Sequence, residues 1–373
     1  MNREAQVASE AQGETGQTVR SALLTVAATL LALPYETWNF GDSVAFDAML
    51  EVSAAVGDAT YARFAHGWAR AWATRALPYR RLDCTAPGHA MVRLSRLYND
   101  SRLLTASVGL ADYLMSRPRI RGVFATWEHS PLVQPYGPDP LDPRGAVLAA
   151  TPPPGVFVDC LHFDPPFFTS LGELTASELY MRVGLEQARG YVELLQGVSG
   201  LFDHFVLEGE PGSFGPGWGR GQGWALLGLL DVVETARRLP GHESQATVDL
   251  LSDAVAKLIA AMVKLQRADG HWYAVVDHPS SRDEHSTAAF MACGISRALR
   301  MGLVSGSSVA KGVERAREAV LRSITPDGML QKVSAAVMAC TQASHYYHVP
   351  TDFLVPWGQG PAALALTEAL HGG

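Results

Sequence analysis

Helical periodicity dominates this chain and limits the folds that it can adopt. Alanine, leucine and other helix-forming residues recur at spacings of three and four, which places them on one face of a helix. The pattern predicts helices over residues 19–33, 42–56, 58–76, 86–98, 101–116, 164–173, 176–197, 221–238, 244–267, 284–302, 308–323 and 358–371. Alternation typical of strands is rare and short, as in residues 272–276. The chain is therefore predicted to be all-α.

The predicted helices follow one another in pairs that are separated by short polar turns. Asp58 and Asp100 stand just before two of these helices, where an aspartate side chain can cap the first free N–H groups. Repeated helix pairs indicate an array of hairpins, and about six of them can close into an (α/α)6 barrel. We expect one barrel domain over residues 19–373, after a disordered polar N-terminus over residues 1–18.

An apolar run over residues 22–33 is similar to the core of a signal peptide. Three glutamates and only two arginines precede it, so the basic leader of a signal peptide is missing. The run is also too short to span a bilayer. We interpret it as the first core helix and expect a cytoplasmic protein without membrane contact, with secretion as the weaker alternative.

Charge and cysteine content exclude several classes of function. The net charge is -7 and the sequence pI is about 5.9, and no basic stripe indicates nucleic-acid binding. The 4 cysteines lie far apart and form no Cys-x-x-Cys pair, which argues against a disulfide scaffold or a zinc site. Free thiols are typical of a reducing compartment. We expect a monomer or a homodimer.

One heptapeptide combines residue types that suit sugar binding. Residues 218–224 read Trp-Gly-Arg-Gly-Gln-Gly-Trp and precede a predicted helix. Glycines allow tight turns and a close approach of the backbone to a ligand. The two tryptophans offer an aromatic wall, and Arg220 offers a planar donor group for a carboxylate. The alternative is a glycine-rich loop whose tryptophans are simply buried.

Two aspartates are candidates for acid–base chemistry. Asp159 lies in an apolar run, and burial among apolar side chains favours the protonated form that a general acid needs near neutral pH. The alternative for Asp159 is a helix N-cap, a role for which Asp164, before two prolines, is better placed. Asp83 precedes a predicted helix that starts near Pro87, so a cap is equally plausible there.

Other polar and proline-rich features carry weaker signals. His204 follows a Gly-Leu-Phe turn, although a lone histidine is more often structural than catalytic. His271, His278 and His285 are spaced by seven, but glycine and proline between them argue against one helix face and a metal site.

Residues 130–155 are rich in proline and predict a long loop. This loop is either a rim or lid of the site or a plain surface insertion.

Taken together, these pieces resemble the unsaturated glucuronyl and rhamnogalacturonyl hydrolases of glycoside hydrolase families 105 and 88. The similarity spans about residues 35 to 370, and the heptapeptide is its most specific part. The matching pieces are Leu82-Asp83 with Pro87-Gly88, Val158-Asp159-Cys160-Leu161 with Pro166-Phe167, Gly200-Leu201-Phe202-Asp203-His204, residues 218–224, Asp269-Gly270-His271-Trp272-Tyr273, Asp283-Glu284-His285-Ser286-Thr287-Ala288 and Gly358-Gln359-Gly360-Pro361.

The resemblance implies an (α/α)6 barrel with the site in its central cavity and no metal or organic cofactor. In that family the aspartate matching Asp159 protonates C4 of a 4,5-unsaturated uronic acid and then helps water to add at C5, which releases the neighbouring sugar. We accordingly predict Asp159 and Asp83 as catalytic residues of an enzyme acting on a small oligosaccharide. The predicted substrate-binding residues are His204, Trp218, Arg220, Trp224, His162 and Trp38.

Two other functions compete with this hypothesis. The same barrel can hydrolyse a saturated glucuronide or act in the synthesis of an unusual sugar. A toroid of this kind can also bind carbohydrate without catalysis. Turnover of an unsaturated disaccharide separates the first hypothesis from both alternatives.

Overall fold

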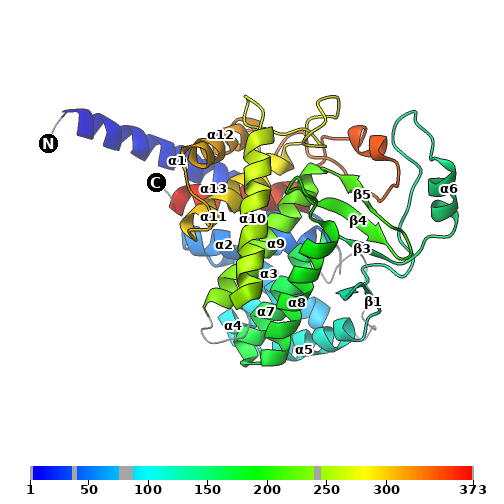
Figure 1. Ribbon diagram of the computed structural model, residues 1–373. Coiled ribbons are helices and arrows are strands. Elements are labelled where there is room, and N and C mark those ends of the chain that lie inside the picture. The colour runs from blue at the N-terminus through cyan, green and yellow to red at the C-terminus, as the bar shows by residue number, and fades with distance from the viewer. Residues whose placement is uncertain (1–2, 36–39, 75–86, 239–244, 372–373) are drawn as a thin grey trace.

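A computed structural model describes residues 3–35, 40–74, 87–238 and 245–371 of the 373-residue chain. It is mostly helical, as the periodicity predicts (Figure 1). The helices are α1 (Arg3–Ala32), α2 (Asp42–Val56), α3 (Thr60–Ala73), α4 (Gly88–Tyr98), α5 (Ser101–Met115), α6 (Pro143–Ala150), α7 (Cys160–Thr175), α8 (Glu178–Leu195), α9 (Gly219–Arg237), α10 (Gln245–Leu265), α11 (Ser286–Arg300), α12 (Ser307–Ser323) and α13 (Pro356–His371).

Six of these helices form a closed inner ring. α2 contacts α4, and the contacts continue through α7, α9, α11 and α13, which returns to α2. The helices α1, α3, α5, α8, α10 and α12 pack around this ring. The predicted (α/α)6 barrel is thereby confirmed.

The inner helices all begin at the same end of the barrel. Arg220, in the first turn of α9, lies against Glu284 just before α11 and against Trp357 in the first turn of α13. At the opposite end, Arg300 in the last turn of α11 pairs with Glu368 near the end of α13. The N-terminal end of a helix carries partial positive charge, so the first of these ends suits a substrate that carries a carboxylate.

The N-terminal region differs from the sequence prediction. α1 starts at Arg3, whereas residues 1–18 were expected to be disordered, and its first turns project from the barrel (Figure 1). The segment is rich in alanine, glutamate and glutamine, which are good helix formers, so local propensity accounts for the extension. Within the described ranges, none of the helices combines the length and the hydropathy of a membrane-spanning segment.

α7 also starts earlier than predicted. It begins at Cys160, so Asp164 lies inside the helix together with Pro165 and Pro166, and the N-cap role considered for Asp164 is wrong. Every residue from Cys160 to Gly172 is buried. Tertiary packing therefore outweighs the low helix propensity of proline in this segment.

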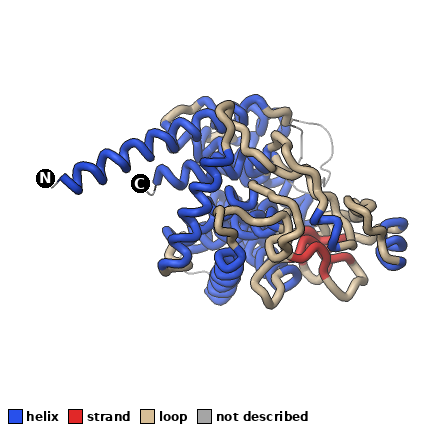
Figure 2. The backbone as a smooth tube through the Cα atoms, turned by 90° about the horizontal axis from the view of Figure 1, so that it is seen from above, coloured by secondary structure: helices blue, strands red, loops and turns tan. Residues whose placement is uncertain are grey.

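A small antiparallel sheet was not predicted. The strands β3 (Gly155–Phe157), β4 (Asp203–Leu207) and β5 (Ser213–Pro216) pair in that order and lie to one side of the helices (Figures 1 and 2). A second, two-stranded sheet joins β1 (Arg119–Ile120) to β2 (Val123–Phe124). β3 leads into α7 and β5 into α9, so the larger sheet positions the starts of two inner helices.

The predicted 130–155 loop contains one further helix, α6. The Asp142 side chain accepts a hydrogen bond from the Gly145 N–H, and Pro143 occupies the first turn, a combination that starts helices. Leu148 of α6 packs with Phe157, Phe205 and other apolar residues on one face of the sheet. The other face carries His204.

Close packing of α7 against α9 leads to a first prediction. A Cβ atom at Gly228 would lie 2.2 Å from the Leu161 carbonyl oxygen, a backbone atom that has no room to move. We expect Gly228→Ala to lower the free energy of unfolding by about 1–3 kcal/mol. Gly67 of α3 has open space around it, so Gly67→Ala should raise that free energy by about 0.5–1 kcal/mol. Urea unfolding of both variants provides the measurement, and equal effects would contradict this packing argument.

Candidate active site

Asp159 occupies the junction between β3 and α7. Its backbone is helical, with φ -54° and ψ -40°, and its side chain makes no capping hydrogen bond to α7. The carboxyl group is only 5% exposed, and among the described residues its Oδ2 atom has no hydrogen-bond partner. The structure therefore excludes the N-cap alternative and leaves a buried carboxyl group available for chemistry.

His204 faces this carboxyl group from β4. Its Nε2 atom lies 3.5 Å from Asp159 Oδ2, and its Nδ1 atom lies 2.7 Å from the Tyr346 hydroxyl oxygen. The adjacent backbone holds the two segments in register, because the Val158 N–H donates to the His204 carbonyl at 2.8 Å. The imidazole ring also packs on Trp218, with centroids 4.4 Å apart. Asp159, His204 and Trp218, three of the candidate residues named from the sequence, therefore lie together.

Arg220 provides a buried cation beside these groups. Its side chain is fully buried, and its guanidinium carbon lies 5.0 Å from the Trp218 ring and 5.9 Å from the Trp357 ring. Burial lowers the pKa of Arg220, and the negative charges of Glu284 and Asp159 oppose that effect. Asp159 and Arg220 therefore interact electrostatically within one site.

Sequence reasoning missed the group that holds Arg220 in place. The Arg220 Nη1 atom lies 3.4 Å from Glu284 Oε1 and donates to the Ser334 hydroxyl, while Nη2 donates to the Ala335 carbonyl at 3.0 Å. Glu284 in turn accepts hydrogen bonds from Ser286, from the Thr287 side chain and backbone, and from the Ser334 N–H. The Asp283–Ala288 motif contained Glu284, but nothing in its local pattern indicated a contact with Arg220.

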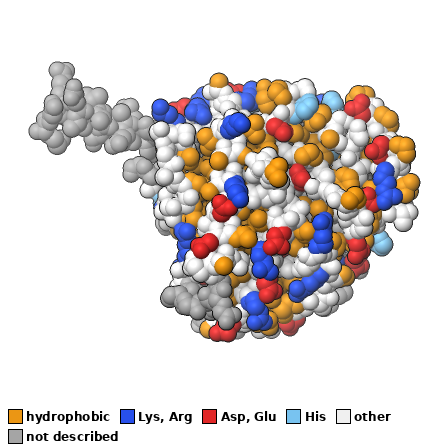
Figure 3. Space-filling model, viewed as in Figure 1, with side chains coloured by type: hydrophobic (Ala, Val, Ile, Leu, Met, Phe, Trp, Pro, Cys, Tyr) orange, Lys and Arg blue, Asp and Glu red, His pale blue; other side chains and the backbone are white. Residues whose placement is uncertain are grey.

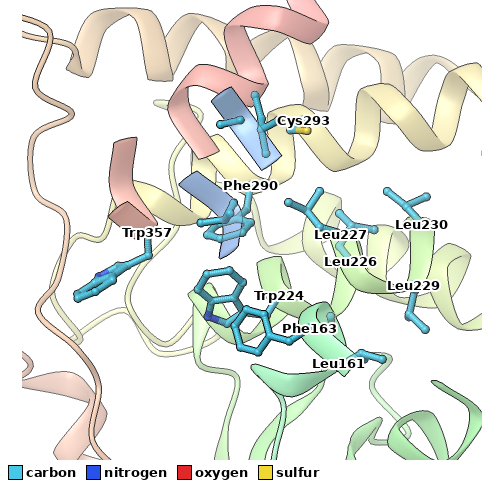
Figure 4. Close-up of a cluster of buried hydrophobic side chains, with 14 of the residues drawn as sticks. Leu161, Phe163, Trp224, Leu226, Leu227, Leu229, Leu230, Phe290, Cys293 and Trp357 are labelled. Atoms are coloured by element: carbon cyan, nitrogen blue, oxygen red, sulfur yellow. The ribbon is translucent and has the colours of Figure 1, made fainter. Parts of the chain in front are cut away.

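Trp224 and His162 lie deeper in the barrel. Trp224 is fully buried, and Figure 4 shows it facing Phe290 among apolar side chains. His162 packs 5.3 Å from the Trp224 ring, and its Nε2 atom lies 3.8 Å from Asp47 Oδ2. These contacts favour a packing role for both residues. Two further predicted residues, Asp83 and Trp38, lie outside the described residues.

The 130–155 segment forms a wall beside the site. Its Val133 N–H donates to the Ala339 carbonyl at 2.9 Å, and its Tyr136 N–H donates to His345 Nδ1 at 3.0 Å. His345 is next to Tyr346, which contacts His204. These contacts support the rim role considered from the sequence.

A cavity of about 590 Å³ opens at the opposite end of the barrel. Arginines on its wall pair with carboxylates: Arg297 with Asp231 at 2.6 Å, and Arg93 with Asp47 at 3.3 Å.

The surface carries positive and negative side chains interspersed on the face shown in Figure 3. Among the described residues, no group of three or more His, Cys, Asp or Glu side chains could hold a metal ion. Cys160, Cys293 and Cys340 are buried, and none of them forms a disulfide within the described residues.

Three buried histidines predict a dependence of stability on pH. Burial lowers the pKa of His271, His285 and His345 to about 4, whereas a histidine in the unfolded chain has a pKa of about 6.5. Between these values the unfolded chain binds more protons than the folded protein, so acidification favours unfolding. We expect the free energy of unfolding to fall by about 2 kcal/mol or more between pH 6.5 and pH 4.5.

Urea unfolding across this pH range measures the effect. The His345→Asn variant should show a smaller slope than the parent protein, because one of the three histidines no longer contributes. A free energy of unfolding that is constant between pH 6.5 and pH 4.5 would contradict the prediction.

Comparison with known proteins identifies relatives of this chain and of its fold. The family model described as Glycosyl Hydrolase Family 88 matches residues 21–372. The unsaturated rhamnogalacturonyl hydrolase YesR of Bacillus subtilis is 26% identical over 339 residues, which cover 89% of this chain and 90% of that protein. A structure of a possible GH105 member from Salmonella enterica matches with a TM-score of 0.81 and 22% identity, covering 95% and 94% of the two chains. The unsaturated glucuronyl hydrolase of Bacillus sp. GL1 matches with a TM-score of 0.68 and 18% identity, covering 96% and 97%.

Proposed function

The chain belongs to glycosyl hydrolase family 88, and on this premise we propose that it removes a 4,5-unsaturated uronic acid from the end of an oligosaccharide. The relatives named as unsaturated rhamnogalacturonyl and glucuronyl hydrolases support this substrate class. The glycoside hydrolase activity itself follows from the family.

The observation that carries the proposal is the burial of the Asp159 carboxyl group and its place opposite His204. Its carboxyl group is buried, does not cap α7, and faces His204 at 3.5 Å. A general acid needs a proton that it can give to the substrate, and Asp159 Oδ2, which has no hydrogen-bond partner in the described part of the chain, is available to carry it. We assign Asp159 as the residue that first donates and then recovers a proton.

The proposed reaction is the hydration of a vinyl ether. Asp159 donates its proton to C4, and the electron pair of the C4=C5 bond forms the new C4–H bond. The positive charge that develops at C5 is shared with the ring oxygen. Water then attacks C5 and gives a proton to the Asp159 carboxylate, so the acid is restored and a hemiketal is formed. Ring opening breaks the bond from C5 to the ring oxygen, and the hemiacetal left at C1 releases the neighbouring sugar.

This chemistry needs one acid–base carboxyl group rather than the pair used in ordinary glycosidases. Glu284 does not compete for that role, because hydroxyl and amide donors and Arg220 already bind its carboxylate. We propose that Arg220 and the N-terminal ends of the inner helices favour the uronate carboxylate, while Trp218 contacts the flattened ring.

A matched pair of disaccharides tests the proposal. One carries a 4,5-unsaturated uronic acid and the other carries its saturated counterpart on the same sugar. We expect loss of the double-bond absorbance with the first substrate and no product from the second. Turnover of the saturated disaccharide alone would favour a glucuronidase on the same fold, and calorimetric binding without turnover would favour a carbohydrate-binding toroid.

A further inference from the structure

Tyr346 contacts the side of His204 that points away from Asp159. Its hydroxyl oxygen lies 2.7 Å from His204 Nδ1, and the tyrosine is 1% exposed. It belongs to the short 3-10 helix Ala343–Tyr347, far in sequence from both β4 and α7. We infer that Tyr346 is a positioning residue that acts through His204 on Asp159. This inference rests on the proposed function.

The hydrogen bond sets which nitrogen of His204 carries the proton. Burial raises the pKa of Tyr346 well above its usual value, so its hydroxyl group keeps a proton that it can donate. When Tyr346 donates to Nδ1, the neutral imidazole carries its own proton on Nε2. That N–H is the one that faces Asp159 Oδ2 at 3.5 Å.

The backbone around Tyr346 leaves little freedom for another arrangement. Gly215 of β5 has a φ of +67°, and a Cβ atom there would lie 2.5 Å from the Tyr346 hydroxyl oxygen and 2.7 Å from the His204 Cβ atom. The adjacent His345 accepts the Tyr136 N–H and contacts the Met338 carbonyl at 3.0 Å, which anchors the 3-10 helix. The positions of the tyrosine and the imidazole are thus fixed together.

This arrangement matters at one step of the reaction. After Asp159 gives its proton to C4, it becomes a buried carboxylate, and an N–H pointing at it stabilises that charge. The other tautomer would present a lone pair to the carboxylate and would oppose proton transfer. A separation of 3.5 Å leaves room for the contact to shorten when substrate binds.

The Tyr346→Phe variant removes the hydroxyl group and keeps the ring. We expect kcat on the unsaturated disaccharide to fall about tenfold with little change in KM, the effect of losing one net hydrogen bond. The same change made in a His204→Gln background should have no further effect, because the tyrosine acts through the histidine. Tyr347→Phe is the matched control, since the Tyr347 ring stacks on His278 at 3.9 Å, and it should keep the parent kcat.

A nitrogen-15 NMR spectrum of the imidazole groups gives a readout that needs no substrate. In the parent protein His204 should carry its proton on Nε2, and in Tyr346→Phe it should shift toward a mixture of tautomers. An unchanged tautomer in the variant, or equal fold-losses of kcat in the presence and absence of His204, would overturn the inference. If the parent protein fails to turn over unsaturated disaccharides, the proposed function fails, and the NMR comparison still decides the role of Tyr346.

Discussion

Replacing Asp159 with asparagine will lower kcat on an unsaturated disaccharide by about 10²–10⁴-fold, the usual contribution of a positioned general acid. Asparagine has nearly the same shape, but its amide cannot protonate C4 or accept the proton of the attacking water. Because the Asp159 side chain does not cap α7, the substitution should leave the helix intact. Steady-state rates measured from the loss of double-bond absorbance, with urea unfolding of the same samples, test both statements.

Asp203 offers a matched control for this experiment. It is adjacent to His204 on β4, but its side chain accepts a hydrogen bond from Ser213, and the alternation of a strand points it to the opposite face. Asp203→Asn should therefore retain kcat within a few-fold of the parent value. An Asp159→Asn variant with parental kcat would remove Asp159 from the mechanism, whatever the effect at Asp203.

The helices were the predictable part of this fold. Each predicted helix has a counterpart in the structure. An outer helix such as α12 buries one face and so repeats its apolar residues at helical spacing. Inner helices such as α7 and α9 are buried on nearly all sides, and their length and content of helix-forming residues made them predictable. The β3–β4–β5 sheet was not predictable in this way. β3 covers only Gly155–Phe157, and its partner β4 lies far along the chain, so no local pattern reveals the pairing.

The candidate site was predictable only in part. Asp159, His204 and Arg220 come together because each stands at the start of an inner helix or on the adjoining strand. Ser334 and Tyr346 come from irregular or short segments late in the chain, and their residue types alone give no signal. Contacts that depend on tertiary structure therefore remained hidden.

Two glycines of the heptapeptide have a packing role that the sequence did not reveal. A Cβ atom at Gly223 would lie 2.3 Å from the Phe290 ring, and one at Gly221 would lie 2.9 Å from the Trp218 ring. Both glycines therefore allow close packing within the protein, a use that the sequence analysis did not consider alongside a close approach to a ligand. Glycine spacing by itself cannot distinguish these two uses, since both need the absence of a side chain.

The Arg220→Met variant is expected to lose about 3–5 kcal/mol of the free energy of unfolding. Methionine can fill much of the space left by the arginine stem, so the main loss is electrostatic. It leaves Glu284, which is 1% exposed, without the cation 3.4 Å away. Removing one partner of a buried ion pair is costly because the remaining charge is neither solvated nor neutralised. Urea unfolding measures the loss. An exposed ion pair on α8, between Arg189 and Glu193, supplies the comparison. Arg189→Met should lower the free energy of unfolding by less than about 1 kcal/mol, because solvent screens the charge that remains on Glu193.

A second substitution separates the charge effect from a simple packing defect. In the double variant Arg220→Met with Glu284→Gln neither charge of this pair remains, while the amide oxygen of glutamine can still accept from Ser286 and Thr287. The double variant should therefore be more stable than Arg220→Met alone. If the double variant instead loses the sum of the free energies that the two single substitutions remove, the two residues contribute independently. Glu284 is then not the group that compensates the charge of Arg220.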